Sequence, residues 1–246
     1  MINADDPVQK VQDAKSQIGF SLESFNRKKR VRIIAFGDIH LECAGIENIT
    51  GLSKADLVII TGDFTNFGEK EDASTIMDVI RRINPKICAV PGNMDKASVA
   101  NYLDELDINI HGKGFVLGDL GIFGVGGSNP TPFNTPTEFS EEELGEIVNR
   151  AYKYVTRASI KVLVSHTPPF NTATDLIGGG VHVGSTAIRE FIEKIQPDFC
   201  FTGHIHESRG EDRIGRTLIL NPGMLKDKGW IELNSQDGGS FTACLN

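Results

Sequence analysis

Residues 31–40 read VRIIAFGDIH, an apolar run followed by glycine, an acid and a histidine. Similar apolar runs followed by Gly, Asp, Asn or His lie at 57–63 (LVIITGD), 86–95 (KICAVPGNMD), 160–166 (IKVLVSH) and 198–206 (DFCFTGHIH). Short apolar runs rich in β-branched residues and ended by Gly, Pro, Asp or His are typical of strands covered on both faces. The five runs therefore predict the buried sheet core of an α/β protein.

Between these runs, apolar residues recur at steps of three and four, which predicts amphipathic helices. Three such stripes lie at 76–83, 144–155 and 188–195. Ser140 with Glu143 forms a capping-box pattern before the second stripe, and Ser185 is the expected N-cap of the third. Further short strands are expected at 115–117, 121–125, 217–220, 230–233 and 240–244. Strand–helix alternation followed by hairpin-like strands favours an α/β core with one mixed sheet or two sheets.

The composition excludes several classes of protein. The 246 residues include 25 basic and 33 acidic side chains, and the net charge of −8 argues against general nucleic-acid binding. No run of about eighteen apolar residues is present, so we expect no membrane-spanning helix. The four cysteines are far apart, and the polar, acidic start does not resemble a secretory signal. These features favour reduced thiols and a cytoplasmic location.

Residues 1–30 differ in charge from the rest of the chain. They carry six basic and four acidic residues, which gives +2 and leaves −10 for 31–246. Asp6-Pro7 is a typical helix start, and apolar residues recur at helical spacing from Val8 to Phe25. We therefore expect an N-terminal helical extension at 1–30 and one domain at 31–246. The helix is expected to pack on its own domain; a homo-oligomer or partner contact is the alternative.

Seven polar side chains follow the predicted buried strands. Carboxyl ends of strands in open α/β sheets converge on one crevice, so these side chains can meet in space. Where one residue separates two of them, extended backbone would send both side chains to the same side. The set is Asp38, His40, Asp63, Asn93, His166, His204 and His206.

This set predicts a site for two metal ions. Two carboxylates, one amide and four imidazoles without a thiolate suit Mn, Fe, Zn or Ni. Seven ligands are too many for one catalytic metal that keeps an open position, but they suit two metals bridged by a carboxylate. Two divalent ions, two carboxylates and a bridging hydroxide leave a charge of about +1, which attracts phosphate. A local cationic site in an acidic protein favours a small phosphate ester.

In chain order these motifs resemble those of the calcineurin-like metallophosphoesterase family. The motifs are Asp38-x-His40, Gly62-Asp63, Gly92-Asn93, His166 and Gly203-His204-x-His206, and the resemblance runs from about residue 31 to 223. It implies a four-layer α-β-β-α sandwich, with two mixed β-sheets face to face and helices on the outside. Residues 31–246 would then form a metallophosphoesterase domain.

The resemblance also implies how the metals are held. One ion would be bound by Asp38, His40, Asp63 and His206. The other would be bound by Asp63, Asn93, His166 and His204, with Asp63 as the bridge. A hydroxide bridging the two divalent ions, with manganese expected first, would attack phosphorus in line.

Met94 departs from the family pattern, which has histidine after Gly-Asn. A thioether is only a weak acceptor and cannot protonate a leaving alkoxide. Relatives that lack this histidine tend to be phosphodiesterases, so we expect hydrolysis of a small-molecule or nucleotide-like diester. Asp95 keeps the acidic end of the motif and would orient a ligand histidine.

Two long polar loops, 128–137 and 167–185, are expected to hold the substrate. Phe133 and His182 in these loops, together with Met94, are the candidate substrate contacts, whereas His111 is expected to be structural. The main alternative is a non-catalytic metal-binding scaffold, as in the retromer subunit of the same fold, with residues 1–30 as its docking element. A dinuclear amide or lactone hydrolase is less favoured because the chain lacks an H-x-H-x-D-H string.

Overall fold

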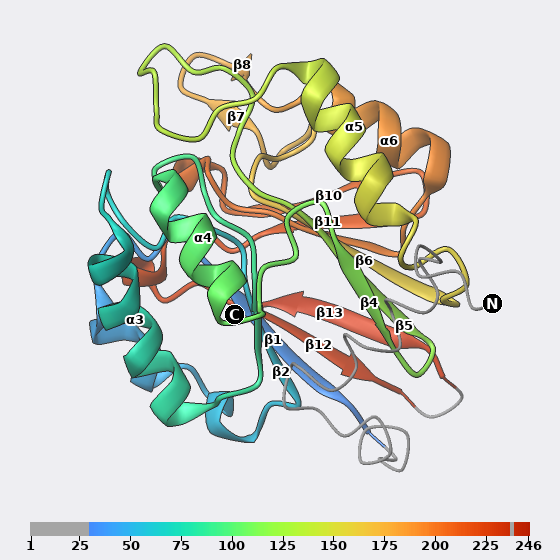
Figure 1. Ribbon diagram of the computed structural model, residues 1–246. Coiled ribbons are helices and arrows are strands. Elements are labelled where there is room, and N and C mark those ends of the chain that lie inside the picture. The colour runs from blue at the N-terminus through green and yellow to red at the C-terminus, as the bar shows by residue number, and fades with distance from the viewer. Residues whose placement is uncertain (1–29, 237–238) are drawn as a thin grey trace, which may run out of the picture.

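A computed structural model of the chain describes residues 30–236 and 239–246 (Figure 1). The predicted N-terminal helix, and with it the predicted oligomer contact, falls on residues that lie outside these ranges. Within these ranges, no helix has both the length and the apolar character needed to cross a membrane.

The first sheet has five strands and is mixed. Its order is β13 (Phe241–Leu245), β12 (Ile231–Ser235), β1 (Arg32–Phe36), β2 (Leu57–Ile60) and β3 (Ile87–Ala89). The strands β1, β2 and β3 are parallel, with Ile34 opposite Val58, whereas β12 pairs with β1 in the antiparallel direction. The parallel strands therefore deliver the loops after β1, β2 and β3 to the same edge of the sheet.

The second sheet has six strands and is also mixed. Its order is β10 (Gly210–Ile214), β11 (Thr217–Asn221), β9 (Phe199–Phe201), β6 (Ile160–Ser165), β5 (Leu120–Val125) and β4 (Gly114–Leu117). The four central strands are parallel, and β10 and β4 are antiparallel edge strands. A separate two-stranded hairpin joins β7 (Leu176–Ile177) to β8 (Val181–His182).

Helices cover the outer face of each sheet (Figure 1). On the first sheet lie α3 (Lys70–Ile83) and α4 (Ala97–Glu105), and on the second lie α5 (Glu141–Tyr152) and α6 (Thr186–Ile195). In the part of the chain that the structure describes, four short 3-10 helices occupy the loops, at Cys43–Asn48, Leu52–Lys54, His206–Ser208 and Leu225–Asp227. The predicted α-β-β-α sandwich with two mixed sheets is confirmed.

Three apolar clusters account for the four layers. In β1, Ile33 and Ala35 belong to the cluster between the two sheets, whereas Ile34 and Phe36 belong to the cluster beneath α3 and α4. A third cluster joins the second sheet to α5 and α6. Because both faces of these strands are covered, their sequences read as continuous apolar runs rather than as alternating ones.

The helix caps also follow from the sequence. Ser140 accepts a hydrogen bond from the backbone N–H of Glu143, whose side chain accepts from the N–H of Ser140, and so completes the predicted capping box. The hydroxyl of Ser185 accepts from the N–H of Ile188 at the start of α6. The nine-residue α4, the edge strand β10 and the hairpin β7–β8 were not predicted, because each is too short to give a clear period.

Candidate metal centre

The predicted ligands lie on loops that leave the carboxyl ends of strands in both sheets. The first sheet supplies Asp38 and His40 after β1, Asp63 after β2 and Asn93 after β3. The second sheet supplies His166 after β6 and His204 and His206 after β9. The fold therefore brings together side chains that are far apart in the sequence, as the strand-end argument predicts.

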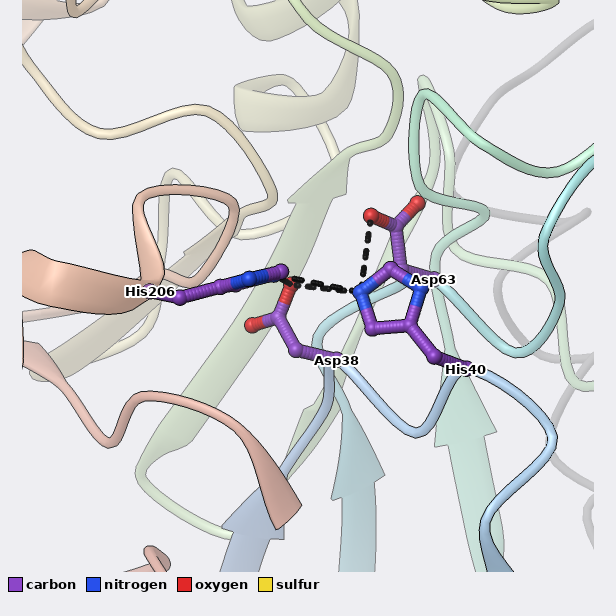
Figure 2. Close-up of side chains that lie close together, drawn as sticks. All are labelled: Asp38, His40, Asp63 and His206. Carbon is purple, nitrogen blue, oxygen red and sulfur yellow. Dashed lines mark hydrogen bonds and ion pairs between the residues drawn. The ribbon is translucent and has the colours of Figure 1, made fainter. Parts of the chain in front are cut away.

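Four of these side chains form one cluster (Figure 2). The potential ligand atoms of Asp38, His40, Asp63 and His206 all lie within 4.8 Å of one another, and their side chains point toward a common centre. Nε2 of His206 lies 3.1 Å from Nε2 of His40 and 3.2 Å from Oδ1 of Asp38. Nε2 of His40 lies 3.7 Å from Oδ2 of Asp63.

A second cluster shares Asp63 with the first. The potential ligand atoms of Asp63, His166 and His204 also lie within 4.8 Å of one another. Nε2 of His166 is 3.4 Å from Oδ2 of Asp63 and 2.9 Å from Oδ1 of Asn93. Asp63 is thus the one residue common to both groups, which is the position that a bridging carboxylate requires.

The surroundings of the histidines fit a cation. Nδ1 of His166 lies 2.9 Å from the backbone oxygen of Thr61, and Nδ1 of His40 lies 2.6 Å from Oδ1 of Asn66. An acceptor at Nδ1 holds the proton there and leaves the Nε2 lone pair free for a metal. Both Nε2 atoms face the clusters, so the nitrogen and oxygen donors suit divalent ions of the first transition row.

Sequence comparisons show the family to which the chain belongs. The sequence model of the family described as calcineurin-like phosphoesterase matches residues 31–208. The uncharacterized protein MJ1162 of Methanocaldococcus jannaschii is 40% identical over 172 residues, which cover 68% of this chain and 77% of that protein. The chain belongs to the calcineurin-like phosphoesterase family. Together with the Asp/His clusters, this membership identifies a metal-dependent phosphoesterase.

One further sequence match and two solved structures are also similar to this phosphoesterase, and the two structures show the similarity of fold. The UPF0046 protein K07C11.7 of Caenorhabditis elegans is 26% identical over 220 residues, which cover 78% of this chain and 69% of that protein. The crystal structure of TT1561 of Thermus thermophilus matches with a TM-score of 0.64 at 15% identity, and covers 87% of this chain and 98% of that one. The crystal structure of a dimetal phosphatase from Danio rerio matches with a TM-score of 0.57 at 8% identity, and covers 87% of this chain and 98% of that one.

Burial and neighbouring charges shift the pKa values of the predicted ligands in this phosphoesterase. Burial is the largest single influence on Asp63 and would raise its pKa, but the charges of His166, His40 and His204 and the hydrogen bond from His166 together lower the pKa to about 2. Burial is also the largest single influence on His166 and would lower its pKa, but the charges of Asp63 and Asp38 and the hydrogen bonds to Asp63 and Thr61 together raise the pKa to about 9. Burial lowers the pKa of His204 to about 4, and the charge of His166 adds to that effect. A histidine must be neutral to bind a metal ion. A cation that binds to His166 would therefore displace a proton from its imidazole.

The backbone of the ligand loops differs from the extended conformation expected from the sequence. Asp38 and His40 both have φ of 49°, Asp63 has φ of 50° and His204 has φ of 67°. These left-handed conformations place the side chains by tight turns rather than by strand alternation, so that expectation is wrong. The loops fix one another, since the N–H of Asp38 donates to the oxygen of Gly62 and that of His40 donates to the oxygen of Asp63. Non-glycine residues with positive φ often mark functional sites, where the surrounding structure maintains the strain.

Two motif glycines allow the loops to approach closely. A Cβ atom on Gly92 would overlap the carboxylate and the backbone nitrogen of Asp63. A Cβ atom on Gly203 would overlap the carboxylate of Asp38. The glycines of the Gly-Asn and Gly-His motifs are therefore required by the packing of the ligands themselves.

Asp95 has a different role from the predicted one. Its carboxylate accepts hydrogen bonds from the N–H groups of Gly92, Phe64 and Thr65 and from the hydroxyl of Thr65, at 2.8–3.2 Å. These hydrogen bonds go to backbone and hydroxyl groups rather than to a ligand histidine. Asp95 thus connects the loop after β3, in which it lies, to the loop after β2 that carries Asp63. These hydrogen bonds stabilise the positions of both loops.

A cavity of about 1190 Å³ opens beside the two clusters. Its lining includes all three candidate substrate residues, Met94, Phe133 and His182, together with the predicted metal ligands Asp63 and His206. Their contact with substrate stays a prediction. Three of the six large exposed apolar side chains in the described ranges line this cavity: Phe67, Phe133 and Phe170.

The sequence did not reveal how the two long loops are held. Nδ2 of Asn129 donates to the oxygen of Val183 at 3.1 Å, and the hydroxyl of Thr167 donates to Oδ1 of Asn129 at 2.8 Å. Asp175 forms a 2.7 Å contact with Nδ1 of His182. No spacing rule predicts such contacts between loop residues without periodic structure.

His111 lies apart from the centre, as expected. Its Nδ1 accepts a hydrogen bond from the N–H of Gly126 at 2.9 Å, and its ring stacks on Phe139. These contacts join the segment before β4 to the loop after β5, which is a structural role.

Proposed function

We propose that the chain is a dinuclear metal-dependent phosphodiesterase that acts on a small-molecule or nucleotide-like diester. The observation that carries the proposal is that two ligand clusters share Asp63 while Met94 lines the cavity beside them. Retention of the whole ligand set at an open cavity favours an enzyme over a non-catalytic scaffold.

The proposed ligand sets follow the two clusters. Asp38, His40, Asp63 and His206 would hold one ion, and Asp63, Asn93, His166 and His204 would hold the other. Manganese is the first metal to test, because nitrogen and oxygen donors of this kind bind several divalent ions. When bound, the two ions supply positive charge for the phosphate and activate a water molecule near neutral pH.

Met94 argues for a diester rather than a monoester. Its backbone N–H donates to Oδ1 of Asp63 at 2.8 Å, so the main chain keeps its place in the centre. Its half-buried side chain, however, offers only a thioether to the cavity. A monoester dianion carries one more negative charge than a diester, and a thioether supplies neither a donor nor a positive charge to match it.

The shape and chemistry of the cavity support the same substrate class. The aromatic rings of Phe67, Phe133 and Phe170 lie around an opening large enough for a group on each side of the phosphorus. Burial of apolar surface against these rings would stabilise an aromatic or nucleoside-like ester group. Lys226 lines the same cavity and is the one lysine or arginine among its lining residues.

Two substrates test the proposal. The purified protein loaded with Mn²⁺ should hydrolyse bis(4-nitrophenyl) phosphate faster than 4-nitrophenyl phosphate, and chelation should abolish both activities. Met94→His should raise the turnover of the monoester, whereas Met94→Leu, which keeps an apolar side chain of similar size, should leave the preference unchanged. A wild-type preference for the monoester, or no metal-dependent turnover of either compound, would contradict the proposal.

A further inference from the structure

The hairpin β7–β8 is held next to the loop that carries His206. In the hairpin, Leu176 lies opposite His182, and the oxygen of Leu176 accepts a hydrogen bond from the hydroxyl of Ser208. The carboxylate of Glu207 accepts from the N–H of Gly178 at 3.3 Å. Glu207 and Ser208, the two residues after His206, therefore hold the hairpin that carries His182 next to the loop of His206.

Asp175 fixes the ring of His182. The Asp175 carboxylate is fully buried and accepts hydrogen bonds from the N–H groups of Asn171, Thr172 and Gly184 at 2.8–3.0 Å. Oδ1 of Asp175 also lies 2.7 Å from Nδ1 of His182. A carboxylate held by three N–H groups acts as an acceptor, so the proton of the imidazole lies on Nδ1. Nε2 is then the nitrogen that is free to exchange a proton with a bound ligand.

The ring of His182 lines the cavity. Its side chain is 28% exposed, and it meets the ring of Phe170 edge-on with 5.9 Å between centroids. Outside the proposed ligands, the lining residues that can carry a charge are Glu42, His182, Glu207 and Lys226. Histidine is the side chain used most often for proton transfer near neutral pH, and an Asp–His pair with a free Nε2 is a recurrent arrangement for it.

We propose that His182, oriented by Asp175, donates the proton to the leaving oxygen of the diester. The proposal rests on the phosphodiesterase function given above, and it supplies the acid that Met94 cannot. Water adds to phosphorus, the bond from phosphorus to the leaving oxygen breaks, and that oxygen keeps the electron pair. The same oxygen takes the proton from Nε2 of His182, and the group departs as the alcohol. The proton lost by the water passes to solvent, and neutral His182 takes up a proton from solvent before the next cycle.

Dependence on the leaving group tests this role. With the Mn²⁺-loaded protein, we would measure kcat/KM for methyl phenyl phosphate and methyl 4-nitrophenyl phosphate in wild type and His182→Gln. The phenolate of the first substrate needs protonation far more than 4-nitrophenolate does. We expect His182→Gln to lower kcat/KM about 10²–10⁴-fold for the phenyl ester and less than about 10-fold for the nitrophenyl ester. An equal loss with both esters, or no loss, would overturn the proposal.

Controls separate proton donation from folding and metal binding. Val181→Thr changes an exposed neighbour in the same hairpin and should keep both rates. His182→Gln should keep the metal content and the thermal unfolding midpoint of wild type; a loss of metal would overturn the proposal as well. Asp175→Asn, as a change in a positioning residue, should reproduce the leaving-group selectivity of His182→Gln. If wild type hydrolyses neither ester, the phosphodiesterase function fails and the proton donor fails with it. If wild type hydrolyses both and the variant loses them equally, the proton donor alone fails.

Discussion

Replacing Gly92 with alanine is expected to weaken metal binding while the chain still folds. The added Cβ would overlap both Oδ1 and the backbone nitrogen of Asp63. A backbone atom cannot rotate away as the end of a flexible side chain can, so one of the two loops must move. The N–H of Gly92 also donates to Asp95 at 2.8 Å, and Oδ1 of Asp63 accepts from the N–H of Met94 at 2.8 Å. Both hydrogen bonds would be disturbed by the same movement.

The expected magnitude follows from this overlap. Overpacking a close-packed site costs about 1–3 kcal/mol, a fraction of the roughly 5–15 kcal/mol that stabilises a typical domain. For a chain of this size, that cost lowers the unfolding midpoint by roughly 2–12 °C. Displacing a reacting group by on the order of 1 Å can lower the rate about 10²-fold. The loss of activity should therefore be large relative to the loss of stability.

Gly145→Ala is the matched control for Gly92→Ala. Gly145 lies within α5, and a Cβ there would meet only the Cβ of Ala187 at 3.8 Å, an ordinary contact. Alanine in a helix interior is favoured over glycine by about 0.5–1 kcal/mol, so this variant should unfold at a slightly higher temperature. Metal content after dialysis, measured by mass spectrometry, and diesterase rate should match wild type for Gly145→Ala and fall for Gly92→Ala. Retention of wild-type metal content and rate by Gly92→Ala would refute the close-packing argument.

Three further outcomes are expected. Asp63→Asn should bind fewer than two Mn²⁺ per chain in isothermal titration calorimetry, because the residue common to both clusters loses its charge; two tight sites would contradict the bridging role. Ser140→Ala should lower the free energy of unfolding by about 1 kcal/mol, since the N–H of Glu143 loses its cap; an unchanged denaturation midpoint would count against this. Burial lowers the pKa of His111 from 6.5 to about 4, so the unfolded chain takes up a proton in that range that the folded chain does not. Stability that is present above pH 6.5 should therefore be lost as the pH falls toward 4, by up to about 3 kcal/mol, and His111→Gln should show a shallower loss by chemical denaturation; identical slopes would disprove the assignment.

The sequence predicted the fold well because the strands are covered on both faces. A strand such as β2 (LVII) must be apolar throughout, and the polar residues that follow it then mark the end of the sheet. The candidate ligands could be recognised in the sequence in the same way, because each of them follows such an apolar run. The approach of ligands from the same sheet was predictable from the parallel order of its strands, without knowledge of any side-chain contact. The meeting of the two sets depends in addition on how one sheet packs on the other.

The parts that were not predicted depend on loop geometry. The left-handed turns at Asp38 and Asp63 arise from hydrogen bonds between two loops, and neither loop alone has a pattern that requires them. Asp175 could not be assigned to His182, because an Asp in a polar loop is most often a turn former. The role of Asp95 was misjudged for a similar reason: its partners are backbone N–H groups, which every sequence has.

The distribution of donors over the two sheets has a consequence for assembly of the domain. Asp38, His40, Asp63 and Asn93 come from one sheet, whereas His166, His204 and His206 come from the other. All seven side chains come together only when the two sheets have packed against each other in the correct relative position. Ligands that bind only the native arrangement stabilise it by mass action. Metal binding would therefore favour correctly folded chains over misfolded ones. Chains in which the two sheets are wrongly packed would fail to bind the two cations.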